Sequence, residues 1–373
     1  FDVGEGTITA AAGILTANMD GSFTLSDASQ LDQVFYTPPA NKHGTVSVDL
    51  VLTIQDLTDG ALTLGQTNPA TIDVAKTVSF DVIAVTDAAP ILALNQTGIE
   101  DNDITFSGLF VVDIDNDGSE TLTMQMLGVP AGAILLCHSG SGLQQLVNSG
   151  GDAINGFTWT FAPDQLSGLV LRPPADFTGD IELTLQSTSM ELSTLEVVTV
   201  TKEFTVAVSP DADDAYFYNV PSDAAGTEGN VIQVDVFGST QELVNANETV
   251  VLSIVVDGTT SDATALDGLV GIRTPDGKAV NFVASGSNFI AVIATSLSQL
   301  ENFEFIAGSH AHGSLAVQIN IGSKDSATVN GVFETDITDS ADFQSKNITI
   351  DIAPEPDAPI LTFTASTITS GEG

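Results

Sequence analysis

Strict alternation of apolar and polar residues marks three segments of the chain, and each segment follows a glycine. The three glycines are Gly44, Gly179 and Gly313, which are 135 and 134 residues apart. A period of two predicts strands that bury one face. The apolar positions are Val46, Val48, Leu50 and Leu52, then Ile181, Leu183 and Leu185, then Leu315, Val317, Ile319 and Ile321.

Blocks of similar sequence surround these segments, which indicates an internal repeat. Three kinds of block recur. The first kind ends at each of the three glycines, the second kind closes each repeat, and the third kind opens each repeat. The first block spans 31–44, 166–179 and 300–313; Pro-Pro-Ala occurs in the first two copies and is lost from the last. The closing block spans 80–90, 204–215 and 348–359, and the opening block starts at Gly98, Gly226 and Ser370.

The repeat predicts how the chain is divided. Residues 1–88 would be a repeat lacking its start, 89–212 a complete repeat, 213–357 a divergent one, and 358–373 the start of another. Short Val-, Ile-, Thr- and Phe-rich segments between turn signals predict an all-β fold of tandem antiparallel β-sandwiches. Trp159 lies on one alternating strand, where we expect it in the core. Because Phe1 is not an initiator Met and Gly373 ends inside a pattern, we expect a piece of a longer protein.

Composition narrows the function. There are 49 acidic and 8 basic residues, for a formal charge of −41, so no basic patch is available for nucleic acid. Such a charge opposes compaction unless salt or bound cations offset it. The chain is nevertheless 43% hydrophobic, which argues against disorder. No apolar run is long enough to cross a membrane, and with Cys137 as the single cysteine there is no disulfide framework.

One acidic stretch has the spacing of a calcium loop. Asp113, Asp115 and Asp117 alternate before Gly118, and Glu120 follows. Carboxylates at this density repel one another unless a cation lies among them. An EF-hand is excluded because its twelfth position, which needs a bidentate Glu, is Met124, and because the flanking segments read as strands.

Further candidate ligands lie where repeats meet. Since Ca²⁺ takes six to eight oxygens, an acid of a linker, a Glu of an opening block and a carboxylate of a neighbouring repeat could share one ion. The competing interpretation is a solvated acidic surface. In the third repeat, the positions equivalent to Asp115, Asp117 and Ser119 are Leu243, Asn245 and Asn247. This loss of carboxylates predicts that the third copy of the loop binds calcium weakly or not at all. The candidates are Asp87, Glu100, Asp113, Asp115, Asp117, Glu120, Asp176, Asp211, Asp213, Asp214, Glu228, Glu355 and Asp357.

Other reactive residues carry weaker signals. His310 and His312 could bind a transition metal, but without a third ligand we interpret them as surface histidines beside a turn. Cys137 and His138 are adjacent on a predicted strand and should point to opposite faces, so they do not predict a nucleophile and base. No nucleophile elbow, zinc-protease motif or phosphate loop occurs, and we expect no enzyme.

The third repeat has the most individual sequence. Tyr216 and Tyr218 follow the linker directly, and they suggest a ligand site for a peptide or glycan. The alternative is an opening strand whose aromatic rings cap the sandwich.

Taken together, the Asp-x-Asp-x-Asp-Gly-Ser-Glu-Thr-Leu stretch at 113–122, Gly-Val-Pro-Ala-Gly-Ala at 128–133, the Pro-Pro-Ala-Asp block and the closing Val-x-Val-x-Pro-x-Ala-Asp at 206–213 resemble a known family. They are similar to the tandem cadherin-like or immunoglobulin-like repeats of giant bacterial RTX adhesins exported by type I secretion. The likeness covers the second repeat almost completely, the first in its later half and the third more loosely.

The resemblance implies an extracellular, surface-anchored rod whose linkers are stiffened by calcium. The expected function is an extender and presenter in cell adhesion or biofilm formation, whose partners are calcium ions and the adjacent repeats. The alternative is that the third repeat is a ligand-binding module that recognises a peptide or glycan on a host or neighbouring cell.

Overall fold

A computed structural model describes residues 6–56, 70–112, 118–140, 142–240, 247–356 and 358–359. The chain divides into two compact units. The first unit comprises Phe1–Gln96, Thr105–Leu171 and Glu182–Thr205, and the second comprises Thr97–Ile104, Arg172–Ile181 and Val206–Gly373. The repeat boundaries expected from the sequence are a different division, and they stay a prediction.

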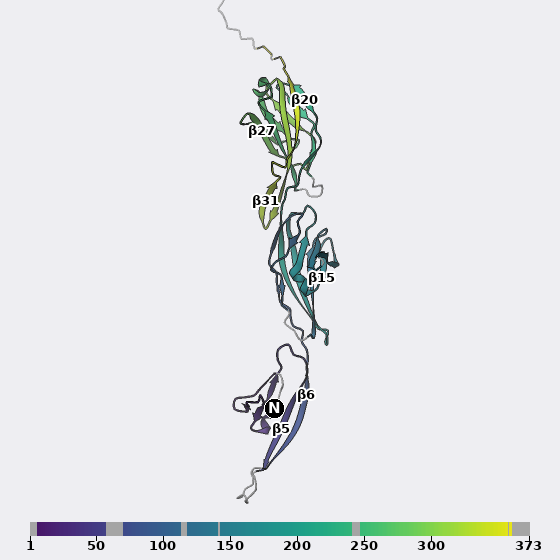
Figure 1. Ribbon diagram of the computed structural model, residues 1–373, viewed down its shortest axis with the longest axis vertical. Helices are drawn as coiled ribbons and strands as arrows, with labels where there is room; N and C mark the ends of the chain where they lie inside the picture. Colours follow the sequence, from purple (N-terminus) through teal and green to yellow (C-terminus); the bar gives the residue numbers. More distant parts are fainter. Residues whose placement is uncertain are drawn as a thin grey trace, which may run out of the picture. The chain divides into compact units, whose positions relative to one another are not determined.

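Up to Ser209, the described residues form short strands, the long hairpins β5–β6 and β17–β18, and two 3₁₀ helices. Figure 1 shows β5, β6 and β15. The elements are β1 (Thr7–Thr9), β2 (Leu15–Ala17), β3 (Phe23–Leu25), η1 (Ala28–Gln33), β4 (Phe35–Thr37), β5 (Gly44–Asp56), β6 (Ala70–Val82), β7 (Ile91–Leu92), β8 (Gln96–Ile99), β9 (Ile104–Thr105), β10 (Phe110–Val111), β11 (Glu120–Val129), β12 (Ile134–Ser139), β13 (Gly142–Gln145), β14 (Val147–Asp152), β15 (Gly156–Phe161), η2 (Pro163–Gly168), β16 (Leu169–Arg172), β17 (Gly179–Glu191) and β18 (Val197–Ser209).

In the part of the remaining chain that the structure describes, fourteen strands and one helical turn follow. They are β19 (Tyr216–Asn219), β20 (Asp223–Thr227), β21 (Val231–Val234), β22 (Phe237–Ser239), β23 (Thr249–Asp257), α1 (Ala263–Leu266), β24 (Leu269–Arg273), β25 (Ala279–Asn281), β26 (Val283–Ser285), β27 (Asn288–Ala294), β28 (Gln299–Leu300), β29 (Phe303–Ala307), β30 (Gly313–Val329), β31 (Val332–Ile337) and β32 (Gln344–Ala353). The prediction of an all-β chain is confirmed.

The three repeated glycines are the first residues of β5, β17 and β30. Their φ angles are 99°, 117° and 116°, a region that side chains with a Cβ rarely adopt. The alternating segments that follow them form the predicted strands. In β30 the apolar positions Leu315, Val317 and Ile319 are at most 2% exposed, so one face of that strand is buried as expected.

Residues 89–212, the predicted second repeat, contain two larger sheets besides the two-stranded sheet of β7 and β10. One has the strand order β14-β15-β11-β17-β18-β8, and the other has the order β13-β12-β16-β9. Strand β11 pairs antiparallel with both β15 and β17. Trp159 on β15 is 4% exposed, so the prediction that it belongs to the core is confirmed. In the first repeat the hairpin of β5 and β6 forms a two-stranded sheet of its own.

The second unit has a larger sandwich. Its main sheet has the order β20-β32-β30-β23-β27-β26, with β31 paired to β30, and a second sheet has the order β21-β29-β24-β25. Phe303 and Phe305 on β29 are fully buried in the core, together with Leu252 and Ile254 on β23. The pairing of β20 with β32 departs from the antiparallel prediction, because the two strands run parallel.

A buried amide organises the start of the second repeat in the first unit. Gln96 is 5% exposed; its Nε2 donates to the carbonyl oxygens of Leu94 at 2.6 Å and Ser107 at 2.7 Å, and its Oε1 accepts from Ser107 N–H at 2.9 Å. Replacing it with Ala would leave these backbone groups unpaired. We expect Gln96→Ala to lower the free energy of unfolding by about 2 kcal/mol. Chemical denaturation measures this, and an unchanged midpoint would contradict it.

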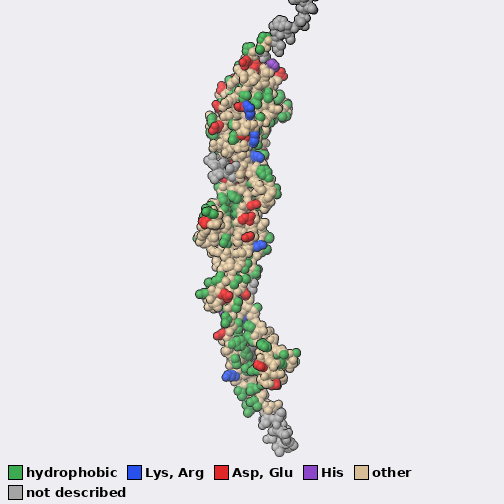
Figure 2. Space-filling model, turned by 180° about the vertical axis from the view of Figure 1, so that it is seen from behind, with side chains coloured by type: hydrophobic (Ala, Val, Ile, Leu, Met, Phe, Trp, Pro, Cys, Tyr) green, Lys and Arg blue, Asp and Glu red, His purple; other side chains and the backbone are tan. Residues whose placement is uncertain are grey.

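Acidic side chains are spread over the face shown in Figure 2, where basic side chains are few. In the described part of the chain, no helix is long and apolar enough to cross a membrane.

Candidate functional site

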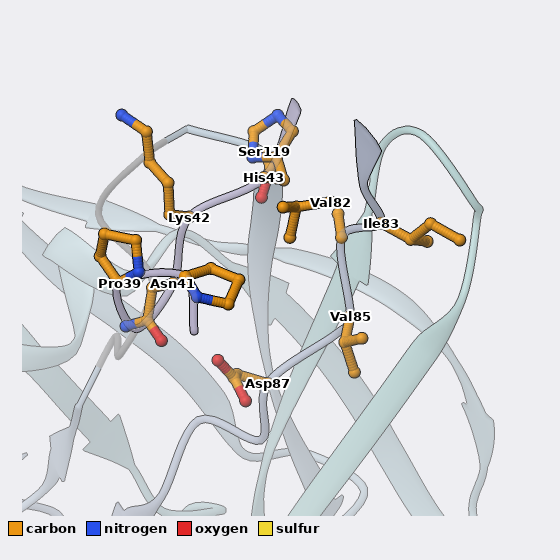
Figure 3. A pocket seen from close by; sticks show the side chains of 11 residues that line it. Pro39, Asn41, Lys42, His43, Val82, Ile83, Val85, Asp87 and Ser119 are labelled. Atoms are coloured by element: carbon orange, nitrogen blue, oxygen red, sulfur yellow. The ribbon is translucent and has the colours of Figure 1, made fainter. Parts of the chain in front are cut away.

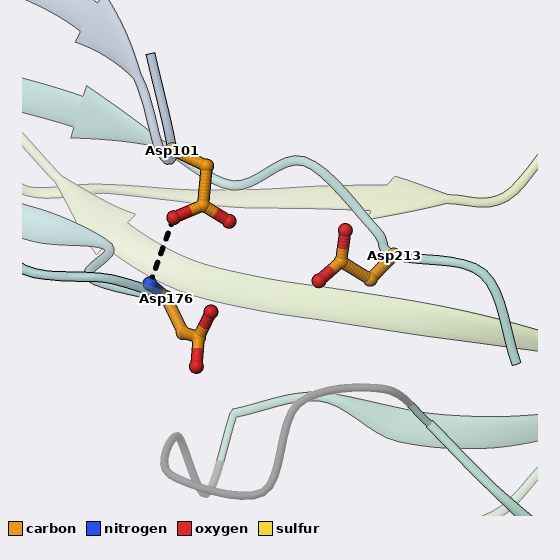
Figure 4. Close-up of side chains that lie close together, drawn as sticks. All are labelled: Asp101, Asp176 and Asp213. Atoms are coloured by element: carbon orange, nitrogen blue, oxygen red, sulfur yellow. Dashed lines mark hydrogen bonds between the residues drawn. The ribbon is translucent and has the colours of Figure 1, made fainter. Parts of the chain in front are cut away.

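Three aspartates of the second unit bring their carboxylates together (Figure 4). Asp101, Asp176 and Asp213 each offer an oxygen, and the three oxygens lie within 4.8 Å of one another. They come from three loops: Asp101 follows β8, Asp176 lies between β16 and β17, and Asp213 follows β18. The backbone N–H of Asp176 donates to Oδ1 of Asp101 at 3.1 Å. Both residues have positive φ angles, 55° for Asp101 and 56° for Asp176, which only a supported loop holds.

The electrostatics of this triad favour a positive ion. Burial raises the pKa of Asp213, and the nearby carboxylates Asp101, Asp176, Asp211 and Asp214 raise it further. Burial and the charge of Asp101 likewise raise the pKa of Asp176. A carboxylate whose neighbours are also negative is held in an unfavourable state until a proton or a cation joins it. Hard oxygens without sulfur or imidazole are the donor set that Ca²⁺ prefers.

Four glutamates hold the linker backbones by one shared pattern. In each case the glutamate Oε1 accepts a hydrogen bond from a linker N–H. The pairs are Glu120 with Asp87 at 2.6 Å, Glu100 with Asp211 at 2.5 Å, Glu248 with Asp213 at 2.7 Å, and Glu228 with Glu355 at 2.8 Å. Each bond fixes a linker acid beside a glutamate that belongs to an opening block or to the start of a central strand.

Among the described residues, three acids close to these linkers are buried and keep one oxygen without a hydrogen-bond partner. They are Glu191, Glu248 and Asp325, each 1% exposed, with Oε2, Oε2 and Oδ2 unpaired. Burial raises the pKa of Glu248 to about 7. In such a place the ionised Oε2 of Glu248 carries a large desolvation cost unless a cation or a proton occupies it. Glu191 differs, because the N–H of Ser193 donates to its Oε1 at 3.0 Å and lowers its pKa.

Glu191 and Asp325 occupy equivalent places. Glu191 is the last residue of β17, and Asp325 lies at the same distance from the first glycine of β30. Glu191 lies directly opposite Glu120 in the pairing of β11 with β17, and Asp325 lies opposite Asp336 in the pairing of β30 with β31. Like charges at opposed positions of a sheet destabilise it. Each pair therefore adds to the negative potential beside a linker.

The structure places the predicted ligands as follows. Asp176 and Asp213 meet in the triad, and Asp211 and Asp214 act on Asp213 through their charge. Asp87, Glu100, Glu120, Glu228 and Glu355 take part in the linker bonds. Asp113, Asp115, Asp117 and Asp357 lie outside the described residues, so the loop that has the calcium spacing is not tested.

Sequence reasoning missed Asp101, Glu191, Glu248 and Asp325 as site residues. Asp101 directly follows Glu100, and Glu248 aligns with Glu120, so both carried a usable signal. Glu191 ends β17 and Asp325 lies within β30, each at the same distance from a repeated glycine, and only a comparison of these strands shows that the two positions are equivalent. When the closing blocks that start at 80 and 204 are superposed, Asp87 corresponds to Asp211. The hydrogen bonds give a different correspondence, because the N–H of Asp87 donates to Glu120 as the N–H of Asp213 donates to the equivalent Glu248.

A pocket of about 290 Å³ in the first unit lies beside another linker acid (Figure 3). Its lining includes Asn41, His43, Asp87 and Ser119. Asn41 is the repeat equivalent of Asp176, and its φ of 58° matches the 56° of Asp176. The pocket thus repeats the arrangement of a turn residue beside a linker acid, with an amide in place of one carboxylate.

The remaining candidate residues are placed separately. His312 Nδ1 lies 3.5 Å from Glu228 Oε2, and His310 is exposed. Cys137 is buried, burial raises its pKa, and its Sγ donates to the carbonyl of Gln165 at 3.4 Å. Tyr218 is 54% exposed, and its ring centroid lies 6.1 Å from those of Tyr216 and Phe237.

The chain is similar to solved immunoglobulin-like and adhesin structures. The titin domains Z1Z2, solved in complex with telethonin, match at TM-score 0.22 and 12% identity over 73% of this chain and 100% of that one. CfaE, the adhesive subunit of CFA/I fimbria of enterotoxigenic Escherichia coli, matches at TM-score 0.30 and 11% identity, over 71% of this chain and 99% of that one. The C-terminal domain of the Streptococcus agalactiae polypeptide BspA matches at TM-score 0.19 and 10% identity, over 71% of this chain and 99% of that one. At such TM-scores and identities, these likenesses carry no argument about function.

No protein-family model matches the chain, and no curated protein matches it either.

Proposed function

We propose that the chain is a calcium-stiffened segment of an extracellular bacterial adhesin, which extends and presents binding modules in cell adhesion or biofilm formation. The observation that carries this proposal is the convergence of Asp101, Asp176 and Asp213 on one point, next to the buried carboxylate of Glu248. A cation at this point would convert repulsion among the carboxylates into shared coordination. Type I secretion and membership of the RTX adhesins belong to the proposal through the sequence resemblance.

The three aspartates alone do not complete a calcium shell, which needs six to eight oxygens. Bidentate carboxylates, Asp211 and water would supply the remainder. Glu248, which lies directly before β23, would contribute its Oε2. These ligands come from both sides of the predicted boundary at 212/213, so binding would join two repeats.

Calcium removal tests the mechanical part of the proposal. We expect small-angle scattering to give different maximum dimensions for the chain in millimolar calcium and in EGTA, because the acids of each linker repel one another without the ion. Isothermal titration on the same sample should show heat of binding. An unchanged maximum dimension, together with no binding heat, would contradict the proposal.

The second candidate is that the third repeat binds a peptide or a glycan. The exposed ring of Tyr218, close to Tyr216 and Phe237, is the observation that favours it. Aromatic rings of this kind provide contact area for sugars and peptides. Array binding by the full chain, compared with Tyr218→Ala, tests it; the absence of any Tyr218-dependent ligand would count against this candidate.

A further inference from the structure

The third repeat carries a hairpin that its predecessor lacks. In the second repeat β17 ends at Glu191 and β18 begins at Val197. In the third, β30 continues past Asp325 to Val329, turns, and returns as β31 before β32 starts at Gln344. Asn330 and Gly331 form the turn with φ angles of 50° and 73°. Two left-handed residues in a two-residue loop suit the twist of a hairpin, and Asn-Gly is the preferred sequence for it.

The tip of this hairpin is attached to the start of β17, within the second unit. The N–H of Asn330 donates to both carboxylate oxygens of Asp180, at 3.0 and 3.1 Å. A Cβ placed on Gly179 would lie 4.0 Å from the carbonyl oxygen of Thr328, so the two backbones run close together. These contacts need neither a metal ion nor a linker acid.

The middle and the base of the hairpin make further contacts. Ala327 and Val329 form a small buried cluster with Ala207 of β18, at 8%, 3% and 2% exposure. At the base, the N–H of Ala212 donates to Oδ2 of Asp336 at 3.0 Å, and the Thr338 hydroxyl donates to the carbonyl of Asp213 at 3.1 Å. The hairpin therefore contacts the segment from Ala207 to Asp213 at both of its ends.

We propose that the β30–β31 hairpin is a metal-independent clasp that keeps the boundary segment 206–213 ordered when calcium is absent. The apolar cluster stays buried, and the N–H groups of Ala212 and Asn330 keep their carboxylate acceptors, at any calcium concentration. The boundary that precedes the second repeat has no such hairpin on β17, so the two boundaries would differ in their dependence on calcium. This goes beyond the proposed function, since it concerns what persists without the ion.

Hydrogen exchange of the full chain, with mass-spectrometric or NMR readout, tests the clasp in EGTA and in saturating calcium. The test variant is Val329→Asp, which places a charge in the cluster. The matched control is Val332→Asp, since Val332 is on the same hairpin and 59% exposed. Asp180→Ala is a second variant that removes only the acceptor at the tip.

In EGTA we expect the wild type and Val332→Asp to protect the amides of Ala212 and Asn330. In Val329→Asp, both amides should exchange about tenfold faster than in the wild type. In Asp180→Ala, only the amide of Asn330 should exchange faster, by a similar factor. Unchanged exchange within β29 would show that the core of each variant is folded. Equal exchange in Val329→Asp and Val332→Asp would overturn the clasp, and so would loss of protection in the wild type on adding EGTA. A failure of the calcium proposal is distinguishable, because calcium and EGTA would then give the same exchange in every variant.

Discussion

Without calcium, the protein should become less stable as the pH rises from 5 to 8, whereas in saturating calcium it should become more stable over that range. Glu248 is the main cause of the first effect, because burial raises its pKa from 4.5 to about 7. The raised pKa values of Asp176 and Asp213 act in the same direction.

The sign follows from proton linkage. Between pH 4.5 and about 7, the folded state keeps a proton on Glu248 that the unfolded state has released, so folding is favoured at the lower pH. The stabilisation is present below 4.5 and is lost as the pH rises through about 7, with a total on the order of 1–3 kcal/mol. Acids with lowered pKa values, such as Asp276 at about 2, are ionised in both states over this window and do not change the slope.

Calcium should reverse the slope because it binds the ionised carboxylates, which are more abundant at high pH. At a free calcium concentration 100 to 1,000 times the dissociation constant, a single site adds about 3 to 4 kcal/mol. Urea denaturation at pH 5, 6.5 and 8, with calcium or EGTA, measures both slopes. Magnesium is the control ion, since it dehydrates reluctantly and should act more weakly. A metal-free midpoint that rises toward pH 8 would contradict this prediction.

Glu248→Gln should stabilise the metal-free protein and remove most of the stabilisation that calcium gives. The glutamine Oε1 can still accept from the Asp213 N–H, as the glutamate does at 2.7 Å. The substitution deletes the charge whose burial is unfavourable, so the apo protein gains stability above pH 7. If Glu248 is a ligand as proposed, the substitution also deletes one anionic oxygen donor, and we expect calcium affinity at this site to fall by about tenfold or more.

The matched variant is Glu301→Gln, which deletes the same charge at an exposed position. Thermal unfolding in EGTA and in calcium, with calorimetric titration, gives both quantities. Glu301→Gln should behave as the wild type in both. If Glu248→Gln kept the full calcium-induced rise in melting temperature, Glu248 would not be a ligand.

Much of the fold follows from residue patterns. The alternation of apolar and polar residues after Gly44, Gly179 and Gly313 predicted three strands at their correct starting residues. The prediction was possible because strict alternation is typical of a strand that buries one face and exposes the other. The parallel pairing of β20 with β32 could not be predicted, since parallel neighbours are set by tertiary contacts rather than by a turn. The extra length of the third repeat was visible in the spacing of its blocks, but its conversion into a hairpin was not, although Asn330-Gly331 is a hairpin signal.

The site was predicted less completely, for a physical reason. Sequence spacing shows which acids are close along the chain, and Asp176 and Asp213 were chosen for their positions in repeated blocks. It does not show which acids become buried. Glu191 and Asp325 acquire their role from being 1% exposed next to other carboxylates, and that depends on the sheet around them.

The boundary segment 211–213 presents three consecutive N–H groups to three different carboxylates. Asp211 donates to Glu100, Ala212 to Asp336 and Asp213 to Glu248. Because these bonds use the backbone, the bonds themselves exclude only proline, which has no N–H, whereas the proposed calcium site needs the carboxylate of Asp213.

Length is the stricter requirement at this boundary. One inserted residue would shift the donors relative to acceptors directly after β8, directly before β23 and on β31, and at least one bond would be lost. Residues 354–356 show the complementary case: Glu355 lies between Pro354 and Pro356, so only its N–H can donate, and Glu228 accepts it. Variation among repeats of this kind should therefore be found in linker composition far more often than in linker length.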